Sequence, residues 1–292
     1  MPSLKEVRNK IVSVGSTMQI TSAMKMVSAA KLKRATDAIV QMRPYANKLK
    51  EILENVSSSV DVSENVFARQ SVNANVLIIA VSSNRGLAGA FNANIIKKVN
   101  SLINNEYKNS DVTIVPVGKK VQDAFRKTKY FISGQDIPHH NNELVDKVDY
   151  EKSAFVMGKI MDAYLNKQFD KVIIVYNQFR NAAVQIPTEE QLLPVTPAAS
   201  NTKSAKQDYI FEPSQEFIVN ELIPRSVKTQ FYKALLDSVA SEHGARMTAM
   251  HKATDNAKAM QRDLKITYNK ARQAAITKEI LEIVGGAEAL KG

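Results

Sequence analysis

The chain has 292 residues, with 40 Lys and Arg against 29 Asp and Glu, and no Cys or Trp. The absence of Cys excludes a disulfide scaffold, a zinc ribbon, an iron–sulfur cluster and a thiol nucleophile, and four His leave few ligands for a metal centre. A hydrophobic fraction of 44% is ordinary for a globular protein. No apolar run is long enough for a membrane span, and the first residues lack the apolar core of a secretory signal. We therefore expect a soluble, cytosolic protein of one or two domains.

The positive charge is concentrated at the two ends of the chain. Residues 1–50 carry ten Lys and Arg against two Asp and Glu, a net charge of +8. Residues 221–292 carry twelve against eight, a net charge of +4, and residues 51–220 carry eighteen against nineteen. A basic surplus suggests a polyanion such as nucleic acid as partner, but here the surplus belongs to the ends and the middle is neutral.

A long helix is predicted from Ser3 to about residue 58, and Pro44 can kink it. Ser3 and Glu6 have the spacing of a capping box. Apolar or small side chains alternate in steps of three and four at Leu4, Val7, Ile11, Val14, Met18 and Thr21. The apolar positions then continue with less regular spacing at Met24, Val27, Leu32 and Ile39. This pattern is typical of one seam of a coiled coil.

A second, longer helix is predicted from about residue 213 to Gly285-Gly286, because no Pro follows Pro224. Its apolar face runs through Phe231, Leu235, Val239, Ala253, Ala257, Met260, Leu264, Tyr268, Ala271 and Ala275. Helices of this length are rare and are not stable alone. We therefore expect the two ends to pair as an antiparallel coiled coil, with the last turns of the longer helix extending past its partner.

The middle of the chain alternates predicted strands and helices. Strands are expected at residues 76–81, 112–117 and 172–176, and helices at 90–107, 119–127 and 149–168. Residues 182–212 contain three prolines and indicate edge strands or loop. The βαβ alternation predicts a small, largely parallel sheet.

The predicted fold class is α/β: a long antiparallel coiled coil of N- and C-terminal helices plus a small Rossmann-like α/β middle domain. The expected boundaries are 1–58 for the N-terminal coiled-coil helix, 74–212 for the middle domain and 213–292 for the C-terminal coiled-coil helix.

The turn after the first strand does not have a nucleotide-binding pattern. Arg85, Gly86 and Gly89 fit neither the G-x-G-x-x-G nor the Walker spacing, so the glycines are expected to permit a tight strand-to-helix turn. Arg85 itself has two interpretations that local chemistry does not separate. Its side chain could cap a carbonyl of its own chain, or it could be presented to an external carboxylate.

No catalytic or metal site is predicted. His139 and His140 fall in a polar loop, and His243 and His251 are eight residues apart on a helix, too far for an i,i+4 metal pair. We therefore expect no catalytic residue, no metal and no cofactor in this chain.

Two features of the first helix favour a contact surface. The cations Lys25, Lys31, Lys33 and Arg34 have few acidic neighbours, although a solvated face is the ordinary explanation for such a patch. Met24, Lys25 and Met26 cannot all face one seam, so at least one of these side chains is expected to point outward.

Four segments distributed along the chain match one protein family, and they occur in the same order as in that family. They are residues 20–32, 83–89, 209–213 and 245–287. They resemble the gamma subunit of F-type ATP synthases, bacterial type. The resemblance implies a central rotor shaft that couples ion-driven rotation of the c-ring to ATP synthesis or hydrolysis at the beta subunits. The implied partners are the alpha and beta subunits of an alpha3beta3 hexamer, the epsilon subunit and the c-ring, with no nucleic acid. The implied location is the cytoplasmic side of the bacterial plasma (inner) membrane, with a membrane association that is indirect through the c-ring.

The resemblance also implies contact residues. Those matching beta-subunit contacts are Met24, Lys25, Arg85, Lys97, Arg272, Gln273 and Thr277, and those matching c-ring contacts are Tyr209, Phe211 and Glu212. Asn84 stands where Asp is frequent in the family and Phe211 where Tyr is common. The plant-type regulatory dithiol is absent because the chain has no Cys.

Two other functions remain as alternatives. A basic coiled-coil protein that binds nucleic acid would explain the charge, but the first 44 residues contain no aromatic side chain for base stacking. An α/β nucleotide-binding enzyme would explain the middle domain, but its phosphate loop is missing.

Overall fold

The computed structural model describes residues 3–59, 67, 69, 74–132, 137–138, 141–195 and 215–289. The chain forms two compact units, one of residues 1–28 with 247–292 and one of residues 29–246. Two long helices, α1 (Leu4–Ser59) and α6 (Gln215–Ala289), contribute to both. Both helices were predicted, and α6 continues through Gly285-Gly286, where its end was expected.

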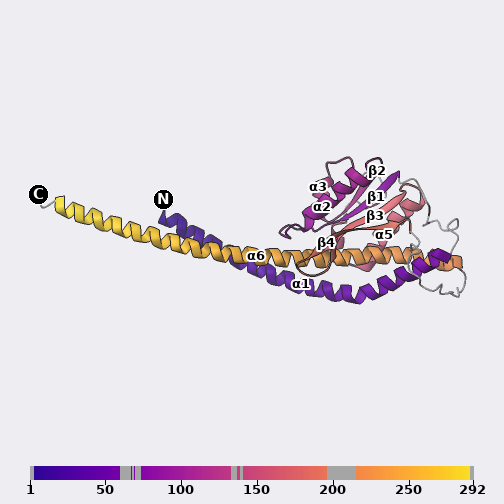
Figure 1. The fold of residues 1–292 in the computed structure, drawn as a ribbon, viewed down its shortest axis with the longest axis horizontal. Helices are drawn as coiled ribbons and strands as arrows, with labels where there is room; N and C mark the ends of the chain where they lie inside the picture. Colours follow the sequence, from indigo (N-terminus) through magenta and orange to yellow (C-terminus); the bar gives the residue numbers. More distant parts are fainter. Residues whose placement is uncertain are drawn as a thin grey trace. The chain divides into compact units, whose positions relative to one another are not determined.

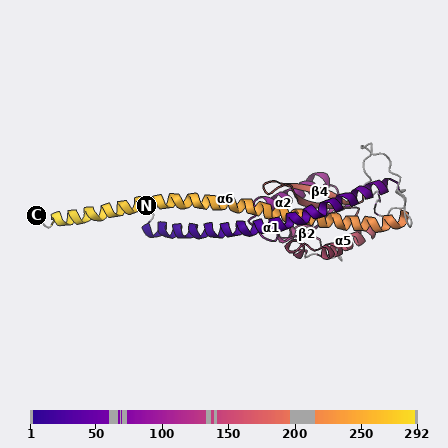
Figure 2. The same ribbon diagram turned by 90° about the horizontal axis from the view of Figure 1, so that it is seen from below.

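In the first unit, α1 and α6 run side by side in opposite directions (Figures 1 and 2). The hydroxyl of Thr254 donates to Oγ1 of Thr21 at 2.8 Å, and a Cβ on Gly15 would lie 3.0 Å from Nε2 of Gln261. A residue later in α1 thus lies beside a residue earlier in α6, which confirms the antiparallel pairing.

The predicted seam is correct at its start and wrong at two later positions. The first six predicted side chains of α1, from Leu4 to Thr21, are all buried or half-buried. Val27 and Met260, however, are 58% and 56% exposed, while Ser28 and Gln261 turn inward in their place. A helix with 3.6 residues per turn drifts from a strict 3.5-residue pattern, so the inward position moves on by one residue.

The second unit contains one four-stranded sheet. Its strands are β1 (Asn75–Val81), β2 (Asp111–Val117), β3 (Lys171–Phe179) and β4 (Gln185–Leu193), in the order β2-β1-β3-β4. The first three are parallel, as predicted, and β4 pairs antiparallel with β3. Pro187 lies in β4, where it is tolerated because the strand is at the edge of the sheet.

Helices cover both faces of this sheet (Figure 1). One face packs on α2 (Phe91–Ser101) and α3 (Lys119–Phe125), and the other packs on α5 (Tyr150–Leu165) and the first half of α6. Alternate β1 residues go to opposite faces: Ile78 lies with Ile95 of α2, and Ile79 lies with Phe231 of α6. Every residue from Val76 to Val81 is therefore buried, as the continuous apolar run predicted.

Three smaller features refine the predicted helices. A π-helical turn, Leu102–Glu106, continues α2 to its expected end, and the short α4 (Glu143–Asp146) was not predicted. At the start of α1, the amide of Ser3 donates to Glu6 Oε2 and the amide of Glu6 donates to Ser3 Oγ, at 3.1 and 3.3 Å. The predicted capping box is therefore confirmed.

Within the second unit, α1 and α6 are joined by an apolar cluster and an ion pair. Ile39 packs with Leu236 and Ala240. Arg43 donates to Asp237 Oδ1 at 2.8 Å, and burial raises the pKa of the Asp237 carboxyl although Arg43 opposes that shift.

Pro44 does not end α1, although it cannot donate to the carbonyl of Val40, one turn earlier. Val40 is 62% exposed, so water can hydrogen-bond to that carbonyl instead.

Gly118 lies between the end of β2 and the start of α3, against Ser82, the residue that follows β1. Its φ of 101° lies where side chains are disfavoured, and a Cβ there would overlap the backbone carbonyl oxygen of Ser82. Ser82 in turn receives a hydrogen bond at Oγ from the amide of Val121, at 3.0 Å. This close approach of two backbones requires glycine.

We predict that Gly118→Ala lowers the free energy of unfolding by about 3 kcal/mol or more, because it combines a strained φ with a backbone overlap. Gly158→Ala is the matched control, because Gly158 lies within α5 and its Cβ would meet only the end of Lys228 at 4.0 Å. That change should stabilise the chain by about 0.5–1 kcal/mol. Urea unfolding of both variants measures the difference, and equal stabilities would contradict the assignment.

Candidate functional site

The turn between β1 and α2 presents Arg85 on the surface. The hydroxyl of Ser83 donates to the carbonyl of Arg85 at 2.6 Å, and the amide of Ser83 donates to Oδ1 of Asn92 at 3.0 Å. Gly89 has a φ of 58°, which supports the predicted tight turn. The side chain of Arg85 is exposed and makes no hydrogen bond or ion pair within the described part of the chain. Of the two interpretations left open, presentation to an outside group is therefore favoured.

Both polar atoms of the Asn84 side-chain amide form hydrogen bonds. Its Nδ2 donates to the carbonyl of Asn142 at 2.8 Å, and its Oδ1 accepts from the amide of Lys119 at 3.0 Å. An aspartate could accept but, when ionised, could not donate to Asn142. The departure from the family pattern thus has a physical reason, because the amide links two other segments to the Arg85 turn.

Lys97 lies on the outer face of α2, whose inner face buries Phe91, Ile95 and Val99. Its side chain is exposed and, over the described ranges, has no ionic partner. The next residue, Lys98, pairs with Glu189 of β4 at 2.9 Å. Of these two cations, Lys97 is therefore the one without an ionic partner over the described ranges.

Met24 and Lys25 lie on α1 in the first unit, and both are half-buried. Lys25 Nζ is 3.3 Å from Nδ1 of His251 on α6. Met26 is 65% exposed, which confirms that one side chain of this triplet points outward.

Arg272, Gln273 and Thr277 lie near the end of α6. All three are exposed, and the hydroxyl of Thr277 donates to the carbonyl of Gln273 in its own helix at 2.9 Å. The guanidinium of Arg272 makes no hydrogen bond or ion pair with any residue that the structure describes.

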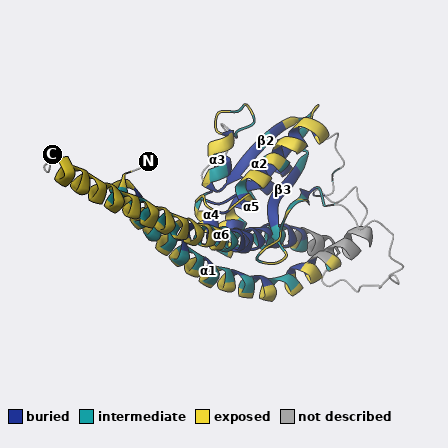
Figure 3. Ribbon diagram, turned by 60° about the vertical axis from the view of Figure 1, so that its left-hand side comes forward, coloured by how far each residue is buried: buried dark blue, intermediate teal, exposed yellow. Residues whose placement is uncertain are grey.

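No helix among the described residues lies beside the last turns of α6. The antiparallel register places the start of α1 close to Arg272, and residues 276–289 are all exposed (Figure 3). Their large apolar side chains are Ile276, Ile280, Leu281, Ile283 and Val284. The predicted extension of α6 past its partner is confirmed.

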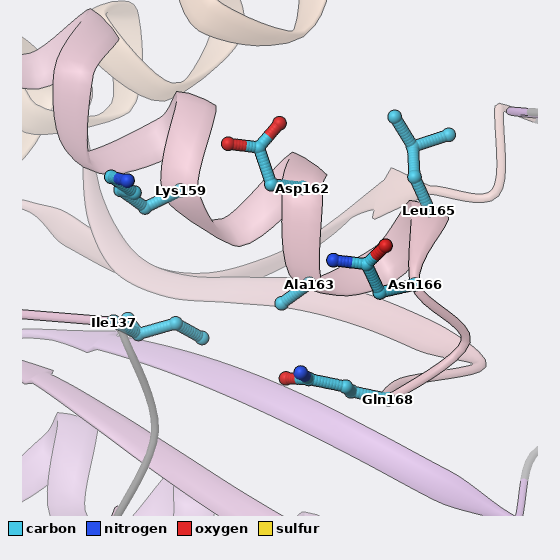
Figure 4. A pocket seen from close by; sticks show the side chains of 7 residues that line it. All are labelled: Ile137, Lys159, Asp162, Ala163, Leu165, Asn166 and Gln168. Carbon is cyan, nitrogen blue, oxygen red and sulfur yellow. The ribbon is translucent and has the colours of Figure 1, made fainter.

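One cavity of the second unit lies at the end of α5. Its volume is about 360 Å³, and Figure 4 shows Lys159 and Asp162 on the last turns of α5, Asn166 directly after the helix and Ile137 on another segment. Its lining contains no histidine and no glycine-rich loop. Within the described ranges, no group of His, Asp or Glu could hold a metal ion. No helix in the same ranges is both long and apolar enough to cross a membrane.

The three expected c-ring contacts, Tyr209, Phe211 and Glu212, lie outside the described residues, as do His139 and His140.

Comparison with known proteins decides between the alternatives. A family model described as ATP synthase matches residues 3–290. The ATP synthase gamma chain of Christiangramia forsetii is 53% identical over 293 residues, covering 100% of both chains. The chain belongs to the ATP synthase gamma chain family. Gamma chains form the central stalk, the rotor of F-type ATP synthases, so the chain is a rotor subunit and not a catalytic one.

Solved structures agree with this assignment. A chain of the Tetrahymena thermophila mitochondrial ATP synthase central stalk and c-ring is 25% identical with a TM-score of 0.57, and the match covers 80% of this chain and 99% of that one. A chain of the Euglena gracilis mitochondrial ATP synthase shares the fold, with a TM-score of 0.67, 21% identity and coverage of 98% and 94%. The predicted family, rotor role and fold are confirmed.

The environment of His243 was not predicted from the sequence. Burial lowers the pKa of this imidazole to about 4, and the positive charges of Arg246 and Lys31 act in the same direction. Its Nδ1 is buried and has no hydrogen-bond partner among the described residues. The ring is therefore neutral in the folded protein near neutral pH.

We predict that His243 makes the chain less stable in acid. Its folded pKa of about 4 lies below the ordinary value of 6.5, so its contribution is present above pH 6.5 and is lost as the pH falls toward 4. His243→Gln should show a shallower fall in the free energy of unfolding over that range. Asp237 and Glu242, whose pKa values are raised by burial, are present in both chains, so the difference isolates the imidazole. Parallel pH profiles of the two proteins would contradict this account.

Proposed function

We propose that the chain is the rotor shaft that couples ion-driven rotation of a c-ring to ATP synthesis and hydrolysis at the beta subunits of an alpha3beta3 hexamer. The observation that carries this proposal is the end of α6, where residues 276–289 are exposed and their apolar side chains have no partner helix in the part of the chain that the structure describes. An apolar helix end of this kind is explained by insertion into a surrounding protein. Family membership indicates that the surrounding protein is the alpha3beta3 hexamer.

Three parts of the chain have different proposed roles. Residues 1–58 and 213–292 form the shaft, and residues 74–212 form the domain nearest the membrane, which also meets the epsilon subunit. Tyr209, Phe211 and Glu212 are the proposed c-ring contacts, on the strength of the family resemblance alone. The complex would then hold this chain at the cytoplasmic side of the bacterial plasma membrane without a membrane helix of its own.

The proposed contacts with the beta subunits are electrostatic and weak. Arg85, Lys97 and Arg272 are exposed, and no acid of the described part of the chain neutralises them. An exposed ion pair contributes about 0–1 kcal/mol, so such contacts can form and break three times in each turn of the shaft. Met24, Lys25, Gln273 and Thr277 complete the proposed set.

Small side chains support the same interpretation of the shaft end. Ala271 and Ala275 are half-buried and Ala274 is exposed, so three small side chains lie beside the exposed Arg272 and Gln273 on these turns of α6. Small side chains at these positions would reduce steric resistance when the helix turns in a surrounding sleeve.

We predict that Arg85→Ala and Arg272→Ala each reduce ATP-driven ion pumping and ATP synthesis by the assembled complex about fivefold, because each removes one ion pair of about 1 kcal/mol at the step that limits coupling. Lys108→Ala is the control, because Lys108 is an exposed cation outside the proposed contacts. Thermal unfolding of the isolated chains should not change. Normal pumping and synthesis in both variants would refute the proposed contacts.

A further inference from the structure

A buried arginine of α6 holds the turn that presents Arg85. Arg246 is 7% exposed, and its Nη2 lies 3.2 Å from the carbonyl oxygen of Arg85 and 3.3 Å from that of Gly86. Its Nη1 donates to Oε1 of Glu242 at 2.6 Å, one helical turn earlier. The guanidinium therefore connects the helix to two successive carbonyls of the turn, and Glu242 fixes its orientation.

The chemistry of this contact requires arginine in particular. A planar guanidinium donates in several fixed directions, so it can bind a carboxylate on one side and two carbonyls on the other. A lysine ammonium in the same place could keep the charge but could not reproduce this fork. Glu242 also compensates the charge of Arg246, which would otherwise be buried without a partner.

The turn that Arg246 holds is in a strained conformation. Leu87 has a φ of 62° and is 64% exposed, although leucine rarely adopts a positive φ. Ala88, the next residue, is buried against Phe91 and Ala245. Strain of this kind persists only where the surrounding structure enforces it, and here the enforcing groups are Arg246 on one side and Ala88 on the other.

We propose that Arg246 is a positioning residue. Together with Glu242 it keeps the Arg85–Leu87 turn in one fixed conformation, so that the turn is already ordered when Arg85 contacts its acidic partner. This inference rests on the proposed function, in which Arg85 contacts the beta subunit. A turn that is already ordered loses little conformational freedom on contact, so a weak ion pair suffices at each encounter. A mobile turn would have to be ordered anew for each beta subunit.

The first test measures the turn itself, independently of rotation. An arginine-specific protease cuts after Arg85 only when the turn can open, and it is applied to the full-length chain. The variant is Glu242→Leu with Arg246→Met, because replacing both members of a buried ion pair by apolar residues usually preserves stability. We expect cleavage after Arg85 to become about tenfold faster, since hydrogen bonds from a charged donor are lost, while cleavage after the exposed Arg126 is unchanged.

Arg246→Lys serves as a second variant in case the double variant does not fold. It adds no site for the protease and keeps the charge beside Glu242. Cleavage after Arg85 should again be faster than in the unchanged chain. Equal cleavage rates in the unchanged chain and in the folded variants would overturn the proposal.

The second test measures whether Arg246 acts through Arg85. In the assembled complex, Arg246→Lys should reduce ATP-driven ion pumping severalfold, but it should cause no further loss when Arg85→Ala is already present. Additive losses would show that Arg246 acts elsewhere and would overturn the proposal. If Arg85→Ala alone has no effect, the proposed beta-subunit contact fails, while the protease result still decides whether Arg246 holds the turn.

Discussion

The structure depends on two helices that each bury a stripe of side chains against the other. Neither α1 nor α6 could persist alone at its length, because an isolated helix gains too little from its own hydrogen bonds. In one unit the seam is narrow and contains Thr21 and Thr254. In the other it contains Ile39 and Leu236, and α6 also packs on the sheet. Since α6 is the longer helix, its last turns remain unpaired, and the proposed function uses that unpaired end.

Charge is divided between the inside and the outside of the molecule. The pairs Arg43–Asp237 and Glu242–Arg246 hold helices and turns in place, and in each pair the acid is almost completely buried. Removing one partner of such a pair leaves an uncompensated charge and is costly. The exposed cations Arg85, Lys97 and Arg272 have no such role within the described part of the chain. A rotor needs this division, because its own fold must be permanent while its contacts with the stator must be temporary.

Much of the fold could be predicted because the signals were local. The Ser3–Glu6 capping box, the buried run from Val76 to Val81 and the steps of three and four at the start of α1 each depend on neighbours within a few residues. The inward turn of Ser28 in place of Val27 could not be predicted, because a small error in helical period accumulates along a seam. The strand β4 remained ambiguous because Pro187 cannot donate a hydrogen bond within a sheet, so the sequence of this segment is compatible with a loop as well as with an edge strand.

The site was predictable from family resemblance and much less from local chemistry. Exposed residues such as Arg85 and Arg272 carry no local signal of what they contact, and the sequence left Arg85 with two interpretations. The role of Arg246 was missed because its acceptors lie 160 and 161 residues away. The amide of Asn84 was noted only as a departure from the family, whereas its partner Asn142 is 58 residues away. Such contacts become visible only when the chain is folded.

Rotation driven by ATP tests the central claim most directly. The chain has no Cys, so Lys108→Cys would create a single attachment point on the exposed surface of the second unit. A bead is attached there, and the alpha3beta3 hexamer is fixed to a surface. The account predicts that the bead turns in one direction when ATP is added, in three equal steps per turn, and stops when ATP is removed. A bead that stays fixed, or that moves at random whether or not ATP is present, would contradict the claim that this chain is the rotor.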